Sequence, residues 1–335
     1  MSVESLRKRF CKDCGYKINV FSDDFFFNAL SKIDGAIEKY DNFEKIVYEK
    51  MDGESNFLDY YDKVRNDAIE SIKNSEGYKK FNTDNFNKYA LTNQYPTKEI
   101  YNINNIGKYF ISIDMKKANF NSLRHYDASI FNNKKSWEDF LKQFTDENYI
   151  IESKNIRQAI LGKCNSGRLE TYEKYLMDIL YKDICTLFND LALKSFNKDE
   201  LIFEIKNVEE YENLKDSLEE KLSNFKIPTT VEVFNLAGIE DQKKKIQGYI
   251  KEFIDGTYEF KAINGLILNI AQKTYNNEKI LDEDLIFENE YGPAKLLSPP
   301  KLTIIASIKK NKEIENTKEE CLWTENYLKQ MLKLH

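Results

Sequence analysis

The chain has 335 residues, of which 41% are hydrophobic and 32% charged, and its net charge is −6. This composition excludes a disordered chain, and the longest apolar runs are far shorter than the ~20 residues of a membrane span. The first residues lack the apolar segment of a signal peptide, and five cysteines are too few for a disulfide framework. We therefore expect an intracellular, cytoplasmic protein of about two domains, with no membrane partner.

Two stretches of the chain contain basic residues and no acidic ones, although the whole chain is acidic. The first is 115–126, with Lys116, Lys117 and Arg124, and the second is 153–169. The basic residues of the second stretch are Lys154, Arg157, Lys163 and Arg168. Such clusters can hold phosphates on an otherwise acidic molecule. The alternative is that they are ordinary solvated surfaces.

Residues 1–105 are predicted to be mostly helical, with a loop over 93–106 where Pro96 interrupts any helix. Next comes a short run of aromatic and β-branched residues, KYFISI at 108–113, which predicts a strand ending just before Asp114. Capping-box spacing from Ser136 predicts a helix to about 144. Helices are also expected over 152–162 and 169–190, where apolar residues recur at helical spacing.

Residues 192–205 read as a hairpin whose turn is Asn197-Lys198-Asp199. An amphipathic helix over 211–225 and an alternating strand over 230–236 follow. The order strand, helices, hairpin, helix, strand predicts an α+β fold, a small antiparallel sheet backed by helices. Beyond it we expect a further αβ segment, with a charged helix over 311–335.

Carboxylates stand at two strand ends of this predicted sheet, Asp114 after the first strand and Asp199-Glu200 in the hairpin turn. Carboxylates brought together are costly unless a cation neutralises them, and hard oxygen ligands suit Mg²⁺ or Mn²⁺. Two such ions can activate an attacking hydroxyl and stabilise a leaving pyrophosphate. The simpler alternative is that Asp199 only stabilises the turn, where Asp is favoured, and Asp114 only ends a strand.

These residues resemble two motifs of the family A DNA polymerases. KDELIFE at 198–204 resembles motif C, commonly H-D-E-L-V-F-E, and ISIDMKKANFNSLRH at 111–125 resembles motif A, D-Y-S-Q-I-E-L-R-x-x-A-H. The resemblance covers about residues 108–236. It implies a polymerase-like palm at 106–240 with reduced fingers at about 127–190, a helical region at 1–105 in the place of a thumb, and a C-terminal αβ extension at 241–335.

The resemblance implies Asp114 and Asp199 as metal ligands, Glu200 as an auxiliary catalytic carboxylate, and Mg²⁺ or Mn²⁺ as cofactor. Nucleic acid and nucleoside triphosphates are the implied partners. Asn119 stands at the position that normally selects against the ribose 2′-OH, and Lys198 replaces the His of motif C. The fingers pair of Arg and Lys four residues apart is incomplete, because Leu161 follows Arg157 at that spacing.

The residues assigned to nucleotide binding are therefore Asn119, Lys154, Arg157, Lys163 and Arg168, and those assigned to nucleic-acid binding are Lys116, Lys117, Arg124 and Lys198. We expect a nucleotidyltransferase that extends a nucleic acid 3′ end, with template dependence open. The alternative is a catalytically inactive, palm-like module that binds nucleic acid or protein. Cys11 and Cys14 form a CxxC without the second pair of a zinc site, and His125 alone supports no hydrolase triad.

Overall fold

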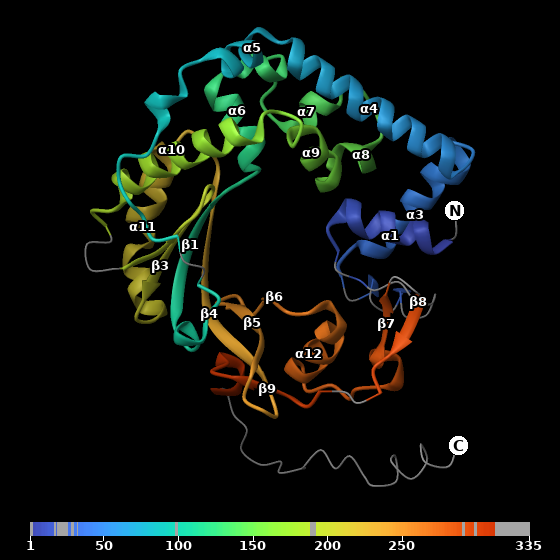
Figure 1. Ribbon diagram of the computed structural model, residues 1–335, viewed down its shortest axis with the longest axis vertical. Helices are drawn as coiled ribbons and strands as arrows, with labels where there is room; N and C mark the ends of the chain where they lie inside the picture. Colours follow the sequence, from blue (N-terminus) through green and yellow to red (C-terminus); the bar gives the residue numbers. More distant parts are fainter. Residues whose placement is uncertain are drawn as a thin grey trace.

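The protein is described by a computed structural model over residues 3–16, 18, 26–27, 30–31, 33–97, 100–187, 192–289, 292–297 and 300–311. It combines helices with an open antiparallel sheet, as the sequence predicts. In Figure 1 the elements follow one another around an arch, with the sheet at the left and the N-terminal helices at the right. The helix predicted over 311–335 lies outside the described residues, except for Asn311.

The N-terminal region is helical, as expected. In its longest helix, α4, apolar residues recur every three to four positions and form one buried face. The next helix begins at Ser75, whose hydroxyl accepts a hydrogen bond from the Tyr78 backbone N–H. The elements are α1 (Val3–Cys14), α3 (Ala36–Lys45), the π-helical turn η1 (Ile46–Lys50), α4 (Glu54–Asn74), α5 (Glu76–Thr83), η2 (Phe86–Tyr89) and η3 (Ile103–Asn105).

Four strands form one half of the sheet: β1 (Tyr109–Met115), β2 (Leu193–Phe196), β3 (Glu200–Ile205) and β4 (Thr229–Asp241). Their order is β2-β3-β1-β4, and each neighbouring pair is antiparallel. Helices connect β1 to β2, a hairpin turn joins β2 to β3, and α11 (Val208–Asn224) connects β3 to β4. This connectivity is the split βαβ, or ferredoxin-like, arrangement.

The helices between β1 and β2 begin and end at identifiable residues. The Ser136 hydroxyl caps α7, as predicted, but α7 ends at Leu141. The predicted helix over 169–190 starts earlier and ends earlier, because Asn165 caps it before Ser166 and a turn follows Ile184. The elements are α6 (Ala118–Tyr126), η4 (Ala128–Phe131), α7 (Trp137–Leu141), α8 (Asn148–Glu152), α9 (Lys154–Leu161) and α10 (Ser166–Ile184).

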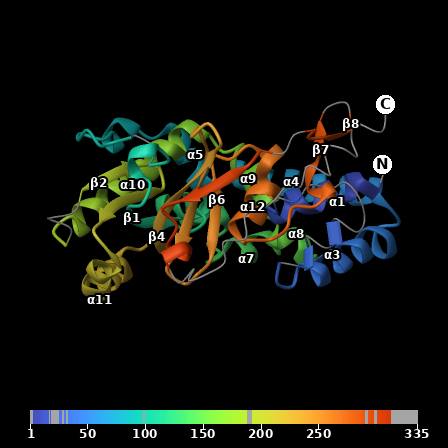
Figure 2. The same cartoon turned by 90° about the horizontal axis from the view of Figure 1, so that it is seen from below.

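The sheet continues beyond residue 240 without a break. β4 extends to Asp241, five residues past the predicted strand end, and pairs with both β5 (Ile246–Phe253) and β9 (Leu302–Ile305). β5 in turn pairs with β6 (Tyr258–Lys261). Figures 1 and 2 agree in placing the separate β7–β8 hairpin beside α1. The remaining elements are η5 (Gly265–Ile267), α12 (Leu268–Tyr275), η6 (Asp282–Leu285), β7 (Ile286–Asn289), β8 (Gly292–Lys295) and η7 (Ile308–Asn311).

The two faces of the central strands have different surroundings. One face, with Ile111, Ile113, Leu201 and Phe203, packs into the main hydrophobic core, which the N-terminal helices share. The other face is apolar only at its lower end, where Phe110, Ile202, Phe234 and Leu236 pack with Ile100. Its upper end carries polar side chains, among them Asp114 and Glu200. We call this second face of the sheet the open face. In Figure 1, α10 and α11 lie on the outer side of the sheet, opposite to the open face.

In the described part of the chain, every helix is too short or too polar to cross a lipid bilayer.

Candidate functional site

Asp114 lies inside β1, one residue before the strand ends, rather than after it as the sequence predicts. Its Cα pairs with Glu200 of β3 on one side and with Thr230 of β4 on the other. Cross-strand partners project from the same face of a sheet, so the carboxyl groups of Asp114 and Glu200 are neighbours on the open face. Burial, followed by the negative charges of Asp199, Glu200 and Glu232, raises the pKa of Asp114 to about 7.

Asp199 belongs to the turn between β2 and β3, and the turn is closed by a hydrogen bond of 2.8 Å from the Asn197 N–H to the Glu200 carbonyl. The Asp199 carbonyl accepts a hydrogen bond of 2.9 Å from the Met115 N–H, which ties the turn to the end of β1. Burial raises the pKa of Asp199; the charge of Lys198 acts against this shift and that of Glu200 adds to it. The structure therefore brings Asp114, Asp199 and Glu200 to one edge of the sheet.

Glu200 is held by three side chains. The Ser112 hydroxyl donates a hydrogen bond of 2.6 Å to Oε1 of Glu200, and the Asn197 amide donates one of 3.4 Å to Oε2. The Lys251 ammonium, from β5, lies 3.7 Å from Oε1 of Glu200 and 3.2 Å from Oε2 of Glu232. Four carboxylates and one ammonium thus gather at the upper end of the open face.

Hard divalent cations fit this edge by the chemistry of its donors, because four carboxylates gather there around the buried ammonium group of Lys251. Among the described residues, no three His, Cys, Asp or Glu side chains converge as a preformed metal cage. Mg²⁺ does not need one: it is commonly bound through one or two carboxylates, with water and substrate phosphates completing its shell. Asp114 and Asp199 are the residues that would hold it.

A further acidic residue lies behind the turn. Glu173 of α10 is 1% exposed, and its Oε1 has no hydrogen-bond partner. Burial raises the pKa of Glu173 to about 8; the charge of Lys198 lowers it, and that of Asp199 raises it. Burial therefore favours the protonated form of Glu173, and its carboxyl group is electrostatically linked to the Lys198-Asp199 turn.

The first basic stretch lies directly after β1. Lys116 is exposed, and Lys117 pairs with Glu138 of α7 at 2.5 Å. Asn119 is half-buried in the first turn of α6. Arg124 donates a hydrogen bond of 2.9 Å to the Lys134 carbonyl. Lys198, in the hairpin turn, is exposed beside Asp199.

The second basic stretch divides into two groups. Lys154 and Lys163 are exposed, and Arg157 of α9 is half-buried. Burial lowers the pKa of Arg157, and the negative charge of Glu138 opposes this shift without cancelling it. Glu138 therefore links Arg157 to Lys117 near the end of β1. Arg168 differs from these residues. Its guanidinium donates to the Phe81 carbonyl at 2.9 Å and to the Asp84 carbonyl, and it stacks 4.0 Å from the centre of the Phe86 ring.

The cysteine pair and the histidine have structural surroundings. Burial raises the pKa of Cys11 to about 12 and that of Cys14 to about 11, so both thiols are protonated at neutral pH. Nδ1 of His125 lies 3.0 Å from the Tyr172 hydroxyl, and burial lowers the pKa of the imidazole. Neither feature contributes a side chain to the open face.

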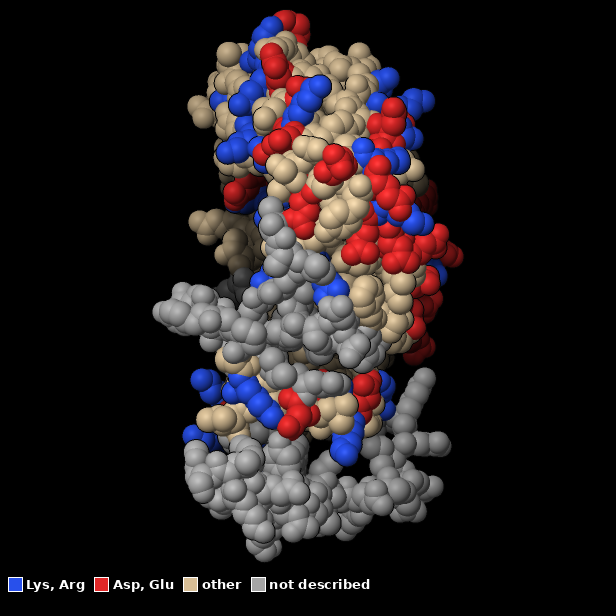
Figure 3. Space-filling view, turned by 90° about the vertical axis from the view of Figure 1, so that its right-hand side faces the viewer, with Lys and Arg blue, Asp and Glu red and all other residues tan. Residues whose placement is uncertain are grey.

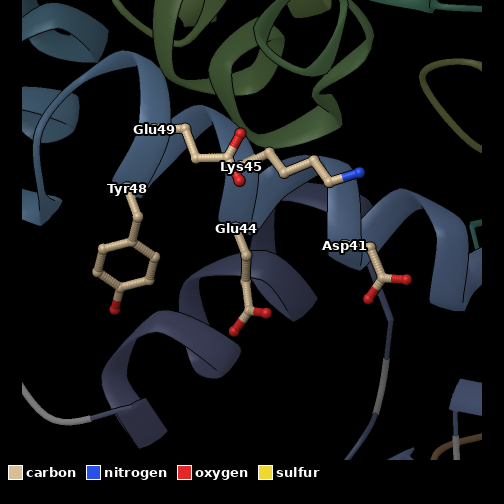
Figure 4. A pocket seen from close by; sticks show the side chains of 5 residues that line it. All are labelled: Asp41, Glu44, Lys45, Tyr48 and Glu49. Carbon is tan, nitrogen blue, oxygen red and sulfur yellow. The ribbon is translucent and has the colours of Figure 1, made fainter.

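Two pockets formed by described residues lie away from the open face. One, of about 350 Å³, is formed by side chains that project from α3 and η1: Asp41, Glu44, Lys45, Tyr48 and Glu49. Its acidic character disfavours phosphate (Figure 4). Another, of about 460 Å³, is basic and includes Lys134, Lys135 and Lys142. On the side of the molecule seen in Figure 3, basic and acidic side chains alternate over the described atoms, with a concentration of acidic ones along one edge.

Sequence reasoning did not find Lys251, Glu232, Ser112 and Glu173. Three of them are polar residues within apolar strand segments: Ser112 in KYFISI, Glu232 in TVEVFNL, and Lys251 in β5. A polar residue in such a segment is a usable signal, because burial without a partner is costly. Their convergence depends on the register of β1 with β4 and of β4 with β5, which the sequence does not reveal.

No protein-family model matches this chain, and no curated protein sequence matches it either.

Proposed function

We propose that this protein is a palm-type nucleotidyltransferase that adds nucleotides to the 3′ end of a nucleic acid. The observation that carries the proposal is the convergence of Asp114, Asp199 and Glu200 at one edge of a ferredoxin-like sheet. The residues that form this edge are those of the motif A-like and motif C-like segments. When bound, divalent cations would supply Lewis acidity for the attacking hydroxyl and for the leaving pyrophosphate.

The chain's own residues have separate roles in this proposal. Asp114 and Asp199 bind the cations. Glu200, whose Oε1 accepts a hydrogen bond from the Ser112 hydroxyl, is the auxiliary carboxylate. Lys117, which shares Glu138 with Arg157, is proposed to contact the nucleic acid. The half-buried Arg157 and the exposed Lys154 and Lys163 are proposed to hold the triphosphate. Their positive charges would stabilise the negative charge that develops during phosphoryl transfer.

Template and sugar preference are part of the same proposal. Asn119 is small and uncharged, and it lies in the first turn of α6, five residues after Asp114. We propose that this position discriminates weakly between ribose and deoxyribose. Lys116, Arg124 and Lys198 are the residues proposed to contact the nucleic acid backbone.

Primer extension tests the proposal. Labelled dNTPs and NTPs, with Mg²⁺ or Mn²⁺, are supplied with single-stranded, primed and blunt-ended substrates. The unaltered protein should incorporate label, and Asp114→Asn and Asp199→Asn should each lower the rate by at least about 100-fold. Asp216→Asn, on the exposed side of α11, is the matched control and should keep full activity. Equal incorporation by all four proteins would refute the proposal.

A second candidate function is nucleic-acid binding without catalysis. It is favoured by the engagement of Arg168 with backbone carbonyls and of Lys251 with Glu200, because both charges are already partnered. A fluorescence anisotropy titration with labelled oligonucleotides at several salt concentrations tests it. Salt-dependent binding with no incorporation under any metal would support this candidate over the enzyme.

A further inference from the structure

Lys251 is a buried lysine in the middle of the carboxylate edge. It comes from β5, outside the segments that resemble polymerase motifs, and its side chain is 5% exposed. By comparison, the Glu232 side chain is 36% exposed and the Glu200 side chain 22%. A lysine is rarely this buried, and an ammonium group removed from water requires negatively charged partners.

The partners of this ammonium group are unequal. Nζ lies 3.2 Å from Glu232 and 3.7 Å from Glu200, and 4.5 Å from the centre of the Phe234 ring. The other two carboxylates of the edge, Asp114 and Asp199, form no ion pair with Lys251 among the described residues. The positive charge therefore neutralises one half of the edge and leaves the other half negative.

This asymmetry bears on which carboxylates a metal ion would find available. Glu200 accepts hydrogen bonds from Ser112 and Asn197 in addition to its ion pair, so its oxygens are already occupied. Among the described residues Asp114 and Asp199 form no ion pair, so no ammonium or guanidinium group occupies their oxygens as Lys251 occupies those of the two glutamates.

We propose that Lys251 is the resident counter-ion of Glu200 and Glu232, and that it restricts divalent cation binding to Asp114 and Asp199. The inference rests on the proposed function. It makes Lys251 a positioning residue: it acts through the two glutamates and keeps them from competing for the ion. Without its charge, Glu200 and Glu232 lose their counter-ion and compete with Asp114 and Asp199 for cations, so the ion is no longer restricted to one place.

Binding of Mn²⁺, measured by the loss of the free-ion signal in electron paramagnetic resonance, tests this directly. We expect Lys251→Met to bind Mn²⁺ several-fold more tightly, or to bind one more ion per chain, than the unaltered protein. Lys251→Arg keeps the charge and should bind as the unaltered protein does. The matched control is Lys108→Met, because Lys108 pairs with Glu204 at 3.1 Å at the other end of the same face.

The outcomes separate this inference from the proposed function. If Asp114→Asn abolishes Mn²⁺ binding while folded Lys251→Met binds as the unaltered protein does, the role of Lys251 is wrong and the metal site stands. If neither the unaltered protein nor Lys251→Met binds Mn²⁺, both fail. A purely structural ion pair would lower the melting temperature of Lys251→Met and leave Mn²⁺ affinity unchanged, which also contradicts the inference.

A measurement on the unaltered protein decides the question if Lys251→Met does not fold. The shielded ammonium of Lys251 should give a slowly exchanging ¹⁵N-lysine side-chain signal, which Glu232→Gln identifies by shifting it. Sub-stoichiometric Mn²⁺ should broaden this signal before those of other lysines, and Asp114→Asn should prevent the broadening. A signal that stays sharp when Mn²⁺ is bound would place the ion away from Lys251 and overturn the inference.

Discussion

Asp114 of β1 and Glu200 of β3 are direct partners across an antiparallel ladder, and both carboxyl groups leave the sheet on its open face. They lie 86 positions apart in the sequence (200 − 114), so only the fold brings them together. Lys251 neutralises Glu200 but forms no ion pair with Asp114 among the described residues. The first prediction concerns this unneutralised carboxyl group.

Stability of the metal-free protein should depend on pH through Asp114. Its pKa in the folded protein, about 7, exceeds the ordinary 3.8, so the folded state binds this proton more tightly than the unfolded chain. The associated stability is fully present below about pH 4 and is lost as the pH rises to about 7. Relative to the unaltered protein, Asp114→Asn should gain roughly 1–2 kcal/mol at pH 8, after allowing for solvent screening, and nothing at pH 4.

Urea unfolding in the presence of a chelator, at pH 4, 6 and 8, measures this difference. Added Mg²⁺ should stabilise the unaltered protein at pH 8 and leave Asp114→Asn unaffected. The prediction compares the stability of Asp114→Asn with that of the unaltered protein at each pH. If the advantage of Asp114→Asn were smaller at pH 8 than at pH 4, the electrostatic role assigned to Asp114 would be wrong.

Asp13 should be essential for the attachment of α1. Its side chain is fully buried and accepts hydrogen bonds from Arg9 at 2.8 Å, Tyr149 at 3.0 Å and Asn155 at 3.0 Å. Asp13→Ala leaves the half-buried Arg9 guanidinium, the Tyr149 hydroxyl and the Asn155 amide without their acceptor, so we expect a loss of about 3–5 kcal/mol of unfolding free energy. Chemical denaturation followed by circular dichroism gives the value.

The control for this variant is Asp62→Ala. Asp62 forms an exposed pair with Arg65 at 3.0 Å, which should contribute at most about 1 kcal/mol. Similar losses for the two variants would show that the buried network is not what anchors α1.

Glu252 should anchor the C-terminal segment to the sheet. It is buried and accepts hydrogen bonds from Asn235 at 3.0 Å, from the Tyr275 hydroxyl at 2.8 Å and from the Ile308 N–H at 2.9 Å. Tyr275→Phe removes one of these and should lower the unfolding free energy by about 1–1.5 kcal/mol.

Tyr249→Phe provides the comparison, because burial alone accounts for the raised pKa of that hydroxyl. It should change stability by less than about 0.5 kcal/mol. Limited proteolysis should also cut Tyr275→Phe faster than the unaltered protein on the C-terminal side of β5. Equal cleavage rates would contradict the anchoring role.

Arg157 and Arg168 should separate into two roles. Arg168→Lys loses the planar fork that reaches the Phe81 and Asp84 carbonyls, so we expect about 1–2 kcal/mol of destabilisation and an unchanged KM for nucleotide. Arg157→Gln should instead raise that KM several-fold with little change in stability. Thermal unfolding and steady-state kinetics on both variants check this. A raised KM in Arg168→Lys alone would reverse the assignment.

The strands and the hairpin at the site were predictable from sequence because their signals are local. A run of aromatic and β-branched residues marked β1, alternation of apolar residues marked β4, and the Asn197-Lys198-Asp199 turn marked the hairpin. Helix ends were less accurate, since caps such as Asn165 act through side-chain hydrogen bonds that override the apolar pattern. β4 was predicted too short because its last residues pair with β5 and with β9, and β9 lies far along the chain.

The carboxylates of the site were predictable, but the residues that control them were not. Asp114 and Asp199 were found through motif resemblance and strand-end placement. Lys251 was not, because nothing local to β5 shows that it faces Glu200. That depends on the register of β1 with β4 and on the register of β4 with β5. Arg168 was assigned to nucleotide binding because it lies in an acid-free stretch. The sequence did not show that its guanidinium donates hydrogen bonds to the carbonyls of Phe81 in α5 and of Asp84 just after it.

Anomalous diffraction from crystals grown with Mn²⁺ tests the central claim most directly. We predict a peak within about 2.0–2.3 Å of carboxylate oxygens of both Asp114 and Asp199, with Lys251 still paired to Glu232. Binding of Mn²⁺ only at other carboxylates, while primer extension proceeds, would contradict the account.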